Sequence, residues 1–347
     1  MRVLHVAQPV DAGVARCVTD FAADQRASGL DARVACPPDG PLVSWLRDAA
    51  VPHAAWPATR SPGPSVPAEA RRLSRIARTW QPDLVHLHSS KAGLAGRLAL
   101  RGRVPTVFQP HAWSFAAVTG PLHTASLAWE RLAARWADAI VCVSSSERSA
   151  GETSGIRARR WAVVENGVDL SRYAPSSRSA ARLSLGLDAA RPLVVCVGRL
   201  SRQKGQDVLL DTARSLDADV VLVGDGPDRS SLEAAAPPNV RLVGRRDDVA
   251  EWYAAADVVA VPSRWEGMAL AALEALACGR PVVASDVTGM RDIGAVDLVP
   301  PEDPDALAAA LRRRLDSPGE PETWRAGARD LRETTAAIRA LYAEVLA

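Results

Sequence analysis

Short apolar runs alternate with stretches of helical periodicity along this chain of 347 residues. A first series of runs predicts strands over residues 2–7, 32–36, 83–88, 105–109, 139–143 and 162–165. A second series predicts strands over residues 192–197, 219–223, 240–243, 257–261, 281–285 and 297–299. Runs that are apolar throughout are typical of parallel strands with helices on both faces. The pattern therefore predicts an α/β fold with two Rossmann-like domains, whose parallel sheets face each other across a cleft.

The segment between the two series has the composition of a linker. Asn166-Gly-Val-Asp169 is followed by a stretch rich in Ser, Arg and Ala. Beyond the second series, Leu331, Ile338, Tyr342 and Val345 are spaced to form one apolar helix face. We therefore expect an N-terminal domain over residues 1–170, a linker over 171–190, a C-terminal domain over 191–320 and final helices over 321–347.

Composition narrows the class of protein. The formal net charge is +2 and no basic block interleaves with aromatic residues, which argues against a nucleic-acid-binding module. The five cysteines are scattered and form no CxxC pair, so we expect a reducing compartment and no zinc site. No signal peptide precedes the first strand and no apolar run approaches the ~18 residues that span a bilayer, so we expect a cytoplasmic protein.

Two glutamates stand where a predicted strand passes into a predicted helix. Glu266 follows the run 257–261, and Glu274 lies within a helix expected over 267–278, about 12 Å further along its axis. The free amide groups of Gly267, Met268, Ala269 and Leu270 would favour an anion between them. This layout suits a sugar nucleotide, although the spacing alone also fits two solvated surface carboxylates.

Lysine usage singles out two further positions. Only Lys91 and Lys204 are lysine among the 42 basic residues, so generic surface cations in this chain are arginines. Lys204 comes five residues after Arg199, which itself follows the run 192–197. An arginine fork and a compact ammonium together suit a diphosphate. The alternative is a pair of surface cations on a loop.

Two common nucleotide motifs are absent. Gly224-Asp-Gly226 lacks the third glycine of a nicotinamide-dinucleotide fingerprint, which disfavours a dehydrogenase. Lys204 is preceded by Gln203 and followed by Gly205, so it is no P-loop lysine.

The motifs of the second half, taken together, resemble those of the retaining glycosyltransferases of family 4, which have the GT-B fold. The matching segments are Gly198-Arg-Leu with Lys204-Gly205, Leu222–Pro227, Ala256-Asp257 with Pro262-Ser263, Glu266–Glu274, Gly279–Asp286 and Asn166–Asp169. The resemblance implies that Arg199 and Lys204 hold the donor diphosphate, Glu266 the donor sugar and Glu274 the ribose. It also implies that main chain near Arg246 meets the base, that residues 267–270 supply amides, and that the last helix crosses back to the first domain.

The resemblance extends to the first half through fewer residues. His111, after the run 105–109, occupies the place of a family histidine beside the transferred sugar; a core or surface histidine is the alternative. The family's first loop has paired glycines near the donor phosphates, and Asp11-Ala-Gly13 retains one. Ser90 and Lys91 follow the run 83–88 and are expected on the acceptor side, with helix capping as the alternative. Trp113 is expected to form part of an apolar wall of the acceptor site, or simply to pack within the domain.

The function that the resemblance implies is retaining transfer of a hexose from a nucleotide sugar to a hydroxyl of a glycan, lipid-linked or small-molecule acceptor. A UDP-sugar is the expected donor and GDP-mannose the next, with no metal and no cofactor because cations already neutralise the diphosphate. A sugar-nucleotide 2-epimerase and a catalytically silent sugar-nucleotide-binding partner remain alternatives. An Arg-rich helix expected over 68–80, with Leu73, Ile76, Ala77 and Trp80 on one face, suggests a peripheral contact with the inner face of a membrane, or a domain helix.

Overall fold

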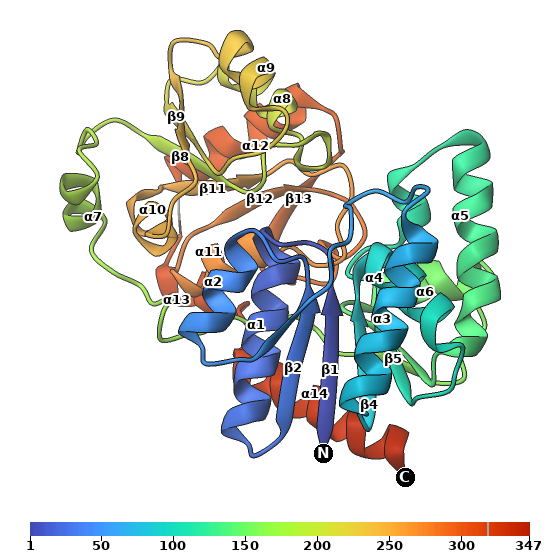
Figure 1. The fold of residues 1–347 in the computed structure, drawn as a ribbon. Coiled ribbons are helices and arrows are strands. Elements are labelled where there is room, and N and C mark those ends of the chain that lie inside the picture. The colour runs from blue at the N-terminus through green and yellow to red at the C-terminus, as the bar shows by residue number, and fades with distance from the viewer. Residues whose placement is uncertain (318) are drawn as a thin grey trace. The chain divides into compact units, whose positions relative to one another are not determined.

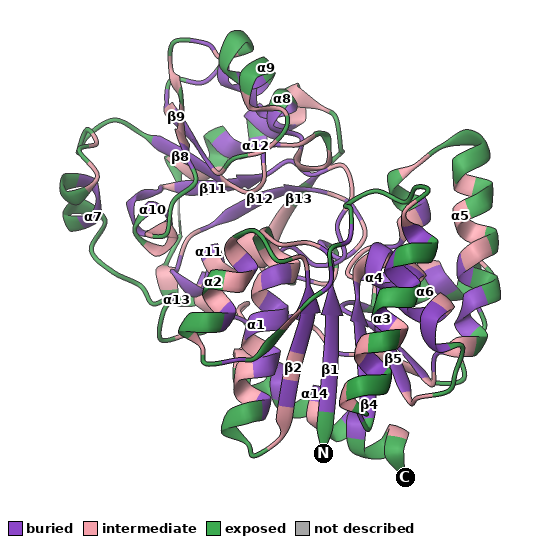
Figure 2. Ribbon diagram, viewed as in Figure 1, coloured by how far each residue is buried: buried purple, intermediate pink, exposed green. Residues whose placement is uncertain are grey.

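The chain folds into two α/β units in the computed structural model, which describes residues 1–317 and 319–347. Unit 1 comprises Met1–Asn166 and Glu333–Ala347, and unit 2 comprises Gly167–Arg332. Each unit is built around one parallel sheet whose strands are mostly buried (Figure 2). No helix within residues 1–317 and 319–347 is long and apolar enough to cross a membrane.

Unit 1 contains a seven-stranded parallel sheet with the order β3-β2-β1-β4-β5-β6-β7. Its strands are β1 (Arg2–Ala7), β2 (Asp31–Cys36), β3 (His53–Ala55), β4 (Leu84–His88), β5 (Thr106–Gln109), β6 (Ala139–Cys142) and β7 (Trp161–Val163). The six strands predicted here are present to within two residues at each end. The sequence pattern missed β3, because His-Ala-Ala is too short to give an apolar run.

Helices cover both faces of this sheet (Figure 1). Side chains alternate along β1: Leu4 and Val6 join a core with α3 (Val66–Trp80) and α4 (Ser89–Leu100), whereas Ala7 joins a core with α1 (Ala12–Ala27) and α2 (Pro41–Asp48). The α1 face is also contacted by α14 (Leu331–Leu346) through Tyr342. The remaining helical segments are η1 (Ser114–Ala117), α5 (Gly120–Ala133), η2 (Ala134–Trp136) and α6 (Ser145–Thr153).

The apolar face of α3 belongs to the core of unit 1. Leu73 and Ala77 are buried, and Ile76 and Trp80 pack against the same hydrophobic cluster. The apolar face of α3 is therefore buried inside unit 1, as expected if this segment is an ordinary helix of the domain. The expectation that this face lies on a membrane is wrong, because its side chains already contact α4 and the sheet.

Unit 2 contains a six-stranded parallel sheet with the order β10-β9-β8-β11-β12-β13. The strands are β8 (Leu193–Val197), β9 (Asp219–Val223), β10 (Val240–Gly244), β11 (Val258–Val261), β12 (Val282–Ser285) and β13 (Val296–Val299). They match the six predicted runs. The helices are α7 (Arg178–Ser184), η3 (Arg202–Lys204), α8 (Gln206–Ala213), α9 (Arg229–Ala235), α10 (Val249–Ala255), α11 (Leu270–Ala277), α12 (Pro304–Asp316) and α13 (Pro321–Arg325).

The segment expected as a linker is partly helical, because it contains α7. Arg182 of this helix is 1% exposed and donates to the carbonyl of Ala255 and, at 2.6 Å, to the carboxylate of Asp257. These bonds satisfy the buried guanidinium, so α7 is fastened to unit 2 rather than free.

Both sheets reverse their strand order beside their first strand. In unit 1 the reversal lies between β1 and β4, and in unit 2 it lies between β8 and β11. Open parallel sheets bind ligands beyond the carboxyl ends of the strands at such a reversal. The loops that follow these four strands are therefore the places to look for function.

Candidate functional site

An ion pair joins the two loops at the strand reversal of unit 2. The ammonium of Lys204, on η3 after β8, donates to Oε1 of Glu266, after β11, at 2.5 Å. Ser263 donates to the same carboxylate oxygen at 2.8 Å. Glu266 is 7% and Lys204 23% exposed at the side chain, so the pair is only partly open to solvent.

A glycine allows these two loops to approach. Gly205 has a φ of +65°, and a Cβ built on it would lie 2.0 Å from the carbonyl oxygen of Pro262. No side chain fits there, so the residue after Lys204 must be glycine if η3 is to lie against the end of β11.

Arg199 extends from the same loop with its side chain uncommitted. Its carbonyl accepts from Nε2 of Gln206 at 2.9 Å, which fixes the backbone. The guanidinium forms no ion pair within the described residues, and its Nε is buried without a hydrogen-bond partner. An unpaired, partly buried cation on the loop that leads from β8 to Lys204 is a ready anion-binding group.

The helix that carries Glu274 begins later than expected. α11 starts at Leu270, so Gly267, Met268 and Ala269 precede it rather than form its first turn. The distance of about 12 Å expected between the two glutamates assumed a continuous helix and does not apply. Glu266 lies before the helix and accepts hydrogen bonds from Lys204 and Ser263. Ala269 is the N-cap and supplies no capping side chain, and its carbonyl accepts from the amides of Ala272 and Leu273.

The other two predicted residues of unit 2 both have protein partners. Tyr253 of α10 donates to Oε2 of Glu274 at 2.8 Å, and burial together with this carboxylate raises the pKa of the phenol. Arg246, after β10, pairs with Asp248 at 2.6 Å, which raises the pKa of the exposed guanidinium. The contact predicted at Arg246 comes from main chain and is independent of this pair.

In unit 1 the predicted residues follow β1, β4 and β5. Gly13 lies in the first turn of α1, after Ala12, which has a φ of +59°. The position that lacks the family's glycine thus still adopts a backbone that favours glycine. His111 also has a φ of +59°, a strained value for a residue with a side chain.

Ser90 and Lys91 lie at the start of α4, and the ammonium of Lys91 is already occupied. It is 2.7 Å from Oε2 of Glu69 and donates to the carbonyl of Ser61 at 3.1 Å. Both side chains of the ion pair are almost fully buried. Lys91 therefore ties α3 and the loop before it to α4, and its predicted acceptor contact remains untested.

Trp113 is buried, and its Nε1 donates to the carbonyl of Glu147 at 2.7 Å. Its ring stacks on Phe115 with centroids 5.5 Å apart. These contacts are those of a packed core residue.

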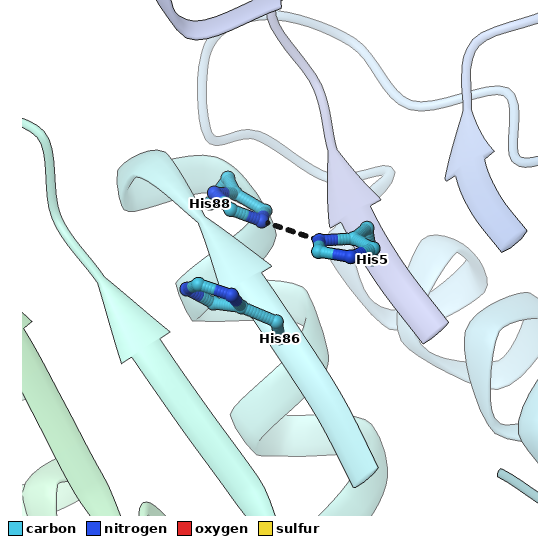
Figure 3. Close-up of side chains that lie close together, drawn as sticks. All are labelled: His5, His86 and His88. Carbon is cyan, nitrogen blue, oxygen red and sulfur yellow. Dashed lines mark hydrogen bonds between the residues drawn. The ribbon is translucent and has the colours of Figure 1, made fainter. Parts of the chain in front are cut away.

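Three buried histidines that the sequence did not single out extend inward from His111. His88 Nδ1 lies 3.1 Å from His111 Nε2, and His88 Nε2 lies 2.9 Å from His5 Nδ1. His5 and His86 are opposite one another on β1 and β4, and Figure 3 shows the three rings gathered on one face of these strands. The signal for His86 and His88 was their spacing of two within an apolar run, which places both side chains on one face.

Burial keeps these imidazoles neutral. It lowers the pKa of His111 to about 3 and that of His5 to about 4, the latter against an opposing hydrogen bond to Gln25. Burial and the neighbouring histidines lower the pKa of His86 and of His88 well below the usual value. One ligand nitrogen from each of His5, His86 and His88 lies within 4.8 Å of the others, so these residues are also a candidate metal group.

Two family models cover most of the chain. The model described as Glycosyltransferase Family 4 matches residues 12–172, and the model described as Glycosyl transferases group 1 matches residues 191–317. A GDP-mannose-dependent alpha-mannosyltransferase of Mycobacterium tuberculosis (strain CDC 1551 / Oshkosh) is 35% identical over 84% of this chain and 81% of its own length. A D-inositol 3-phosphate glycosyltransferase of Mycolicibacterium gilvum (strain PYR-GCK) is 36% identical over 68% of this chain and 60% of its own length.

Solved structures share the fold at lower identity. The structure of Anabaena Alr3699/HepE in complex with UDP-glucose matches with a TM-score of 0.84 at 24% identity, over 99% of this chain and 100% of that chain. WaaG, a glycosyltransferase involved in lipopolysaccharide biosynthesis, matches with a TM-score of 0.75 at 19% identity, over 98% and 99% of the two chains. The chain belongs to glycosyltransferase family 4 and has the GT-B fold.

Proposed function

We propose that this glycosyltransferase moves mannose from GDP-mannose to a hydroxyl acceptor with retention of configuration and without a metal ion. The observation that carries the proposal is the cationic group at the strand reversal of unit 2. There, Lys204 is paired with Glu266 while Arg199 has no ionic partner among the described residues. A diphosphate leaving group would supply the missing negative charge.

Lys204 can serve the diphosphate while it remains paired. An ammonium has three donors, and the carboxylate of Glu266 uses one of them. The other two are available to phosphate oxygens, to which Arg199 can add its fork. Two cations and an uncapped helix start would stabilise the charge that develops on the leaving diphosphate. A divalent cation is then unnecessary for charge neutralisation.

The state of Glu266 supports a same-face mechanism. Retention by double displacement needs an exposed, nucleophilic carboxylate beneath the anomeric carbon. Oε1 of Glu266 instead accepts from both Lys204 and Ser263, which lowers its nucleophilicity and suits it to bind sugar hydroxyls. The oxygen of the departing diphosphate would then take the proton of the acceptor hydroxyl.

The relatives bear on the choice of donor and acceptor. The mycobacterial protein that matches 84% of this chain is named for GDP-mannose, which favours this donor over the UDP-sugar that the breadth of the family made the first expectation. The inositol 3-phosphate glycosyltransferases support a polyol among the acceptors to be tried, although this chain spans about 60% of the length of the one from Mycolicibacterium gilvum.

The test begins with thermal stabilisation by GDP-mannose, UDP-glucose and ADP-glucose, followed by transfer and donor-hydrolysis assays with the donor that binds. We expect GDP-mannose to stabilise the protein and chelator to leave turnover unchanged. A response to UDP-glucose alone would refute the donor, and turnover lost with chelator and restored by a divalent ion would refute the metal-free mechanism. The anomeric configuration of the product, read by NMR, tests retention.

Lys204→Ala tests the role of the ammonium. We expect turnover to fall by about a hundredfold or more, the usual effect of removing one such electrostatic donor, with a much smaller change in donor affinity. Arg202→Ala is the matched control, because Arg202 lies on the same turn η3 and its guanidinium stands over the ring of Trp265. Normal turnover with weaker donor binding in Lys204→Ala would contradict the proposed role.

A further inference from the structure

Arg264 fastens the loop after β11 to the loop after β8. Its amide donates to the carbonyl of Gln203 at 2.8 Å, and Nε2 of Gln203 donates to the carbonyl of Trp265 at 3.0 Å. The guanidinium of Arg264 donates from Nη1 to the carbonyl of Arg202, also at 2.8 Å. These bonds reach two successive residues of η3, so Arg264 holds this turn through its backbone.

Two carboxylates in turn fix the guanidinium of Arg264. Nη1 and Nη2 donate to the two oxygens of Asp207 at 2.9 and 2.7 Å, and Nε donates to Oε1 of Glu302 at 2.8 Å. Asp207 lies in the first turn of α8, and Glu302 lies between β13 and α12. The side chain of Arg264 is 13% exposed, whereas both carboxylates are open to solvent. Arg264, Asp207 and Glu302 thus form a clamp on η3.

The backbone of Glu302 is strained, and the clamp accounts for the strain. Its φ is +58°, a value that a residue with a side chain rarely adopts. Glu302 precedes α12, whose N-cap is Asp303, so the left-handed conformation does not serve to end a helix here. Strain of this kind persists where the surrounding contacts over-determine it. The contact that accompanies it is the ion pair between Glu302 and Arg264.

The clamp controls where the ammonium of Lys204 lies. A turn of three residues has too few hydrogen bonds of its own to be stable alone. Arg264 supplies outside bonds at Arg202, and Lys204, two residues further along, pairs with Glu266, two residues after Arg264. The guanidinium and the ammonium therefore bridge the same two loops at neighbouring points. A lysine could not replace Arg264, because an ammonium lacks the planar fork that binds a carboxylate and a carbonyl together.

We propose that Arg264 is a positioning residue for transfer, which with Asp207 and Glu302 holds η3 so that the ammonium of Lys204 lies where the leaving diphosphate needs it. This inference rests on the proposed function, in which Lys204 stabilises that leaving group. Arg264 does not itself serve the diphosphate, because all three of its guanidinium nitrogens donate to protein acceptors. Displacement of a catalytic group by 1 Å costs roughly a hundredfold in rate, so loss of the clamp should reduce turnover through Lys204.

The order of the Lys204 side chain can be measured without donor or acceptor, because Lys91 and Lys204 are the only lysines of the chain. In protein labelled with ¹³C at lysine Cε, relaxation measures the order of each side chain, and Lys204→Ala assigns the signals by their loss. We expect Lys204 to be ordered in the parent and mobile in Arg264→Met, with Lys91 unchanged. An equally ordered Lys204 in Arg264→Met would overturn the proposal.

Turnover per folded molecule tests whether Arg264 acts through Lys204. We expect Arg264→Met to lower kcat at least about tenfold with a much smaller change in the KM for the donor, and we expect Arg264→Lys not to restore kcat. In the Lys204→Ala background, Arg264→Met should cause little further loss, because the group that it positions is already absent. A loss by the same factor in both backgrounds would overturn the action through Lys204.

Arg314→Met is the matched control. Arg314 is also a partly buried arginine of unit 2 that binds an aspartate, Asp297, through two nitrogens, but it joins α12 to β13. We expect Arg314→Met to lower stability and to leave turnover per folded molecule unchanged; an equal loss of turnover would overturn the special role of Arg264. If Arg264→Met does not fold, Asp207→Asn weakens the clamp from an exposed position and should mobilise Lys204 and lower kcat to a smaller extent.

The two readouts separate this inference from the proposed function. A mobile Lys204 with unchanged kcat in Arg264→Met would overturn the role of the clamp in transfer. Absence of transfer in the parent and in every variant would count against the proposed function, while the order of Lys204 would still show whether Arg264 positions it.

Discussion

Glu147 provides a test of how burial controls the stability of unit 1. It forms a reciprocal cap at the start of α6: its amide donates to Oγ of Ser144 at 3.0 Å, and its Oε2 accepts from the amide of Val143 at 2.7 Å. The side chain is 1% exposed, and Oε1 has no hydrogen-bond partner. Burial, opposed by the bond from Val143, raises the pKa of Glu147 from 4.5 to about 8.

The sign of the effect follows from the proton count. Between pH 4.5 and about 8 the folded protein keeps this proton while the unfolded chain has lost it, so rising pH favours the unfolded chain. One pKa unit corresponds to about 1.4 kcal/mol, so the contribution of Glu147 to the free energy of unfolding falls by at most roughly 3 kcal/mol between about pH 5 and about pH 7. Glu147→Gln removes the titration and keeps an oxygen for the amide of Val143.

We therefore expect Glu147→Gln to match the parent near pH 5 and to exceed it in free energy of unfolding by up to roughly 3 kcal/mol near pH 7. Urea unfolding at several pH values measures this difference, and a carboxyl ¹³C titration measures the pKa directly. Glu152→Gln is the control, because Glu152 is an exposed residue of α6 paired with Arg148. A difference that does not grow with pH, or a variant less stable than the parent near pH 7, would refute the reasoning.

Three further substitutions test packing and backbone. Lys91→Met should lower the free energy of unfolding by roughly 3–5 kcal/mol, because it leaves the buried carboxylate of Glu69 without its ion pair. Adding Glu69→Gln should restore most of the lost stability. If Lys91→Met were instead stable but inactive, the result would support the acceptor contact of Lys91. Ala12→Gly should raise the free energy of unfolding by roughly 1 kcal/mol, because the φ of Ala12 is +59°. Ala15→Gly, within the same helix, should lower the free energy of unfolding. If both substitutions changed it in the same direction, the explanation by backbone strain would be wrong. Gly205→Ala should abolish donor binding in a thermal-shift assay, since its Cβ would meet the carbonyl of Pro262 at 2.0 Å; normal binding would show that the loop can move.

Within the described residues, every strand except β3 was predictable from the sequence, whereas the start of α11 and the histidine cluster were not. Buried parallel strands are apolar along their whole length, so each run in the chain marks its strand directly. The start of α11 lies at Leu270 rather than at residue 267, and its N-cap, Ala269, has no capping side chain that would mark it in the sequence. The bond between His5 and His88 joins residues 83 positions apart. Such long-range partners leave no local pattern.

Lys91 shows the limit of compositional reasoning. Its rarity as a lysine correctly marked a position with a special requirement, but the structure accounts for that requirement by a buried ion pair with Glu69. Lys204 has the same rarity and also pairs with a glutamate, yet its side chain is 23% exposed, and Arg199 on the same loop has no ion pair among the described residues. Exposure and unsatisfied neighbours, which the sequence does not give, separate a structural lysine from one available to a ligand.

Backbone strain independently marks one edge of the sheet of unit 1 as a candidate binding site. Three of the residues with side chains and positive φ, namely Ala50, Gln81 and Arg101, lie at or just beyond the carboxyl ends of helices, where the left-handed conformation is an ordinary way to stop. Ala12, Ser89 and His111 instead follow β1, β4 and β5 directly or nearly so. Helix termination does not explain these three, and strain of this kind concentrates at binding sites. These strained residues lie around the strand reversal between β1 and β4, and one of them is His111, from which the buried histidines extend inward. Their position favours a ligand at this edge of the sheet.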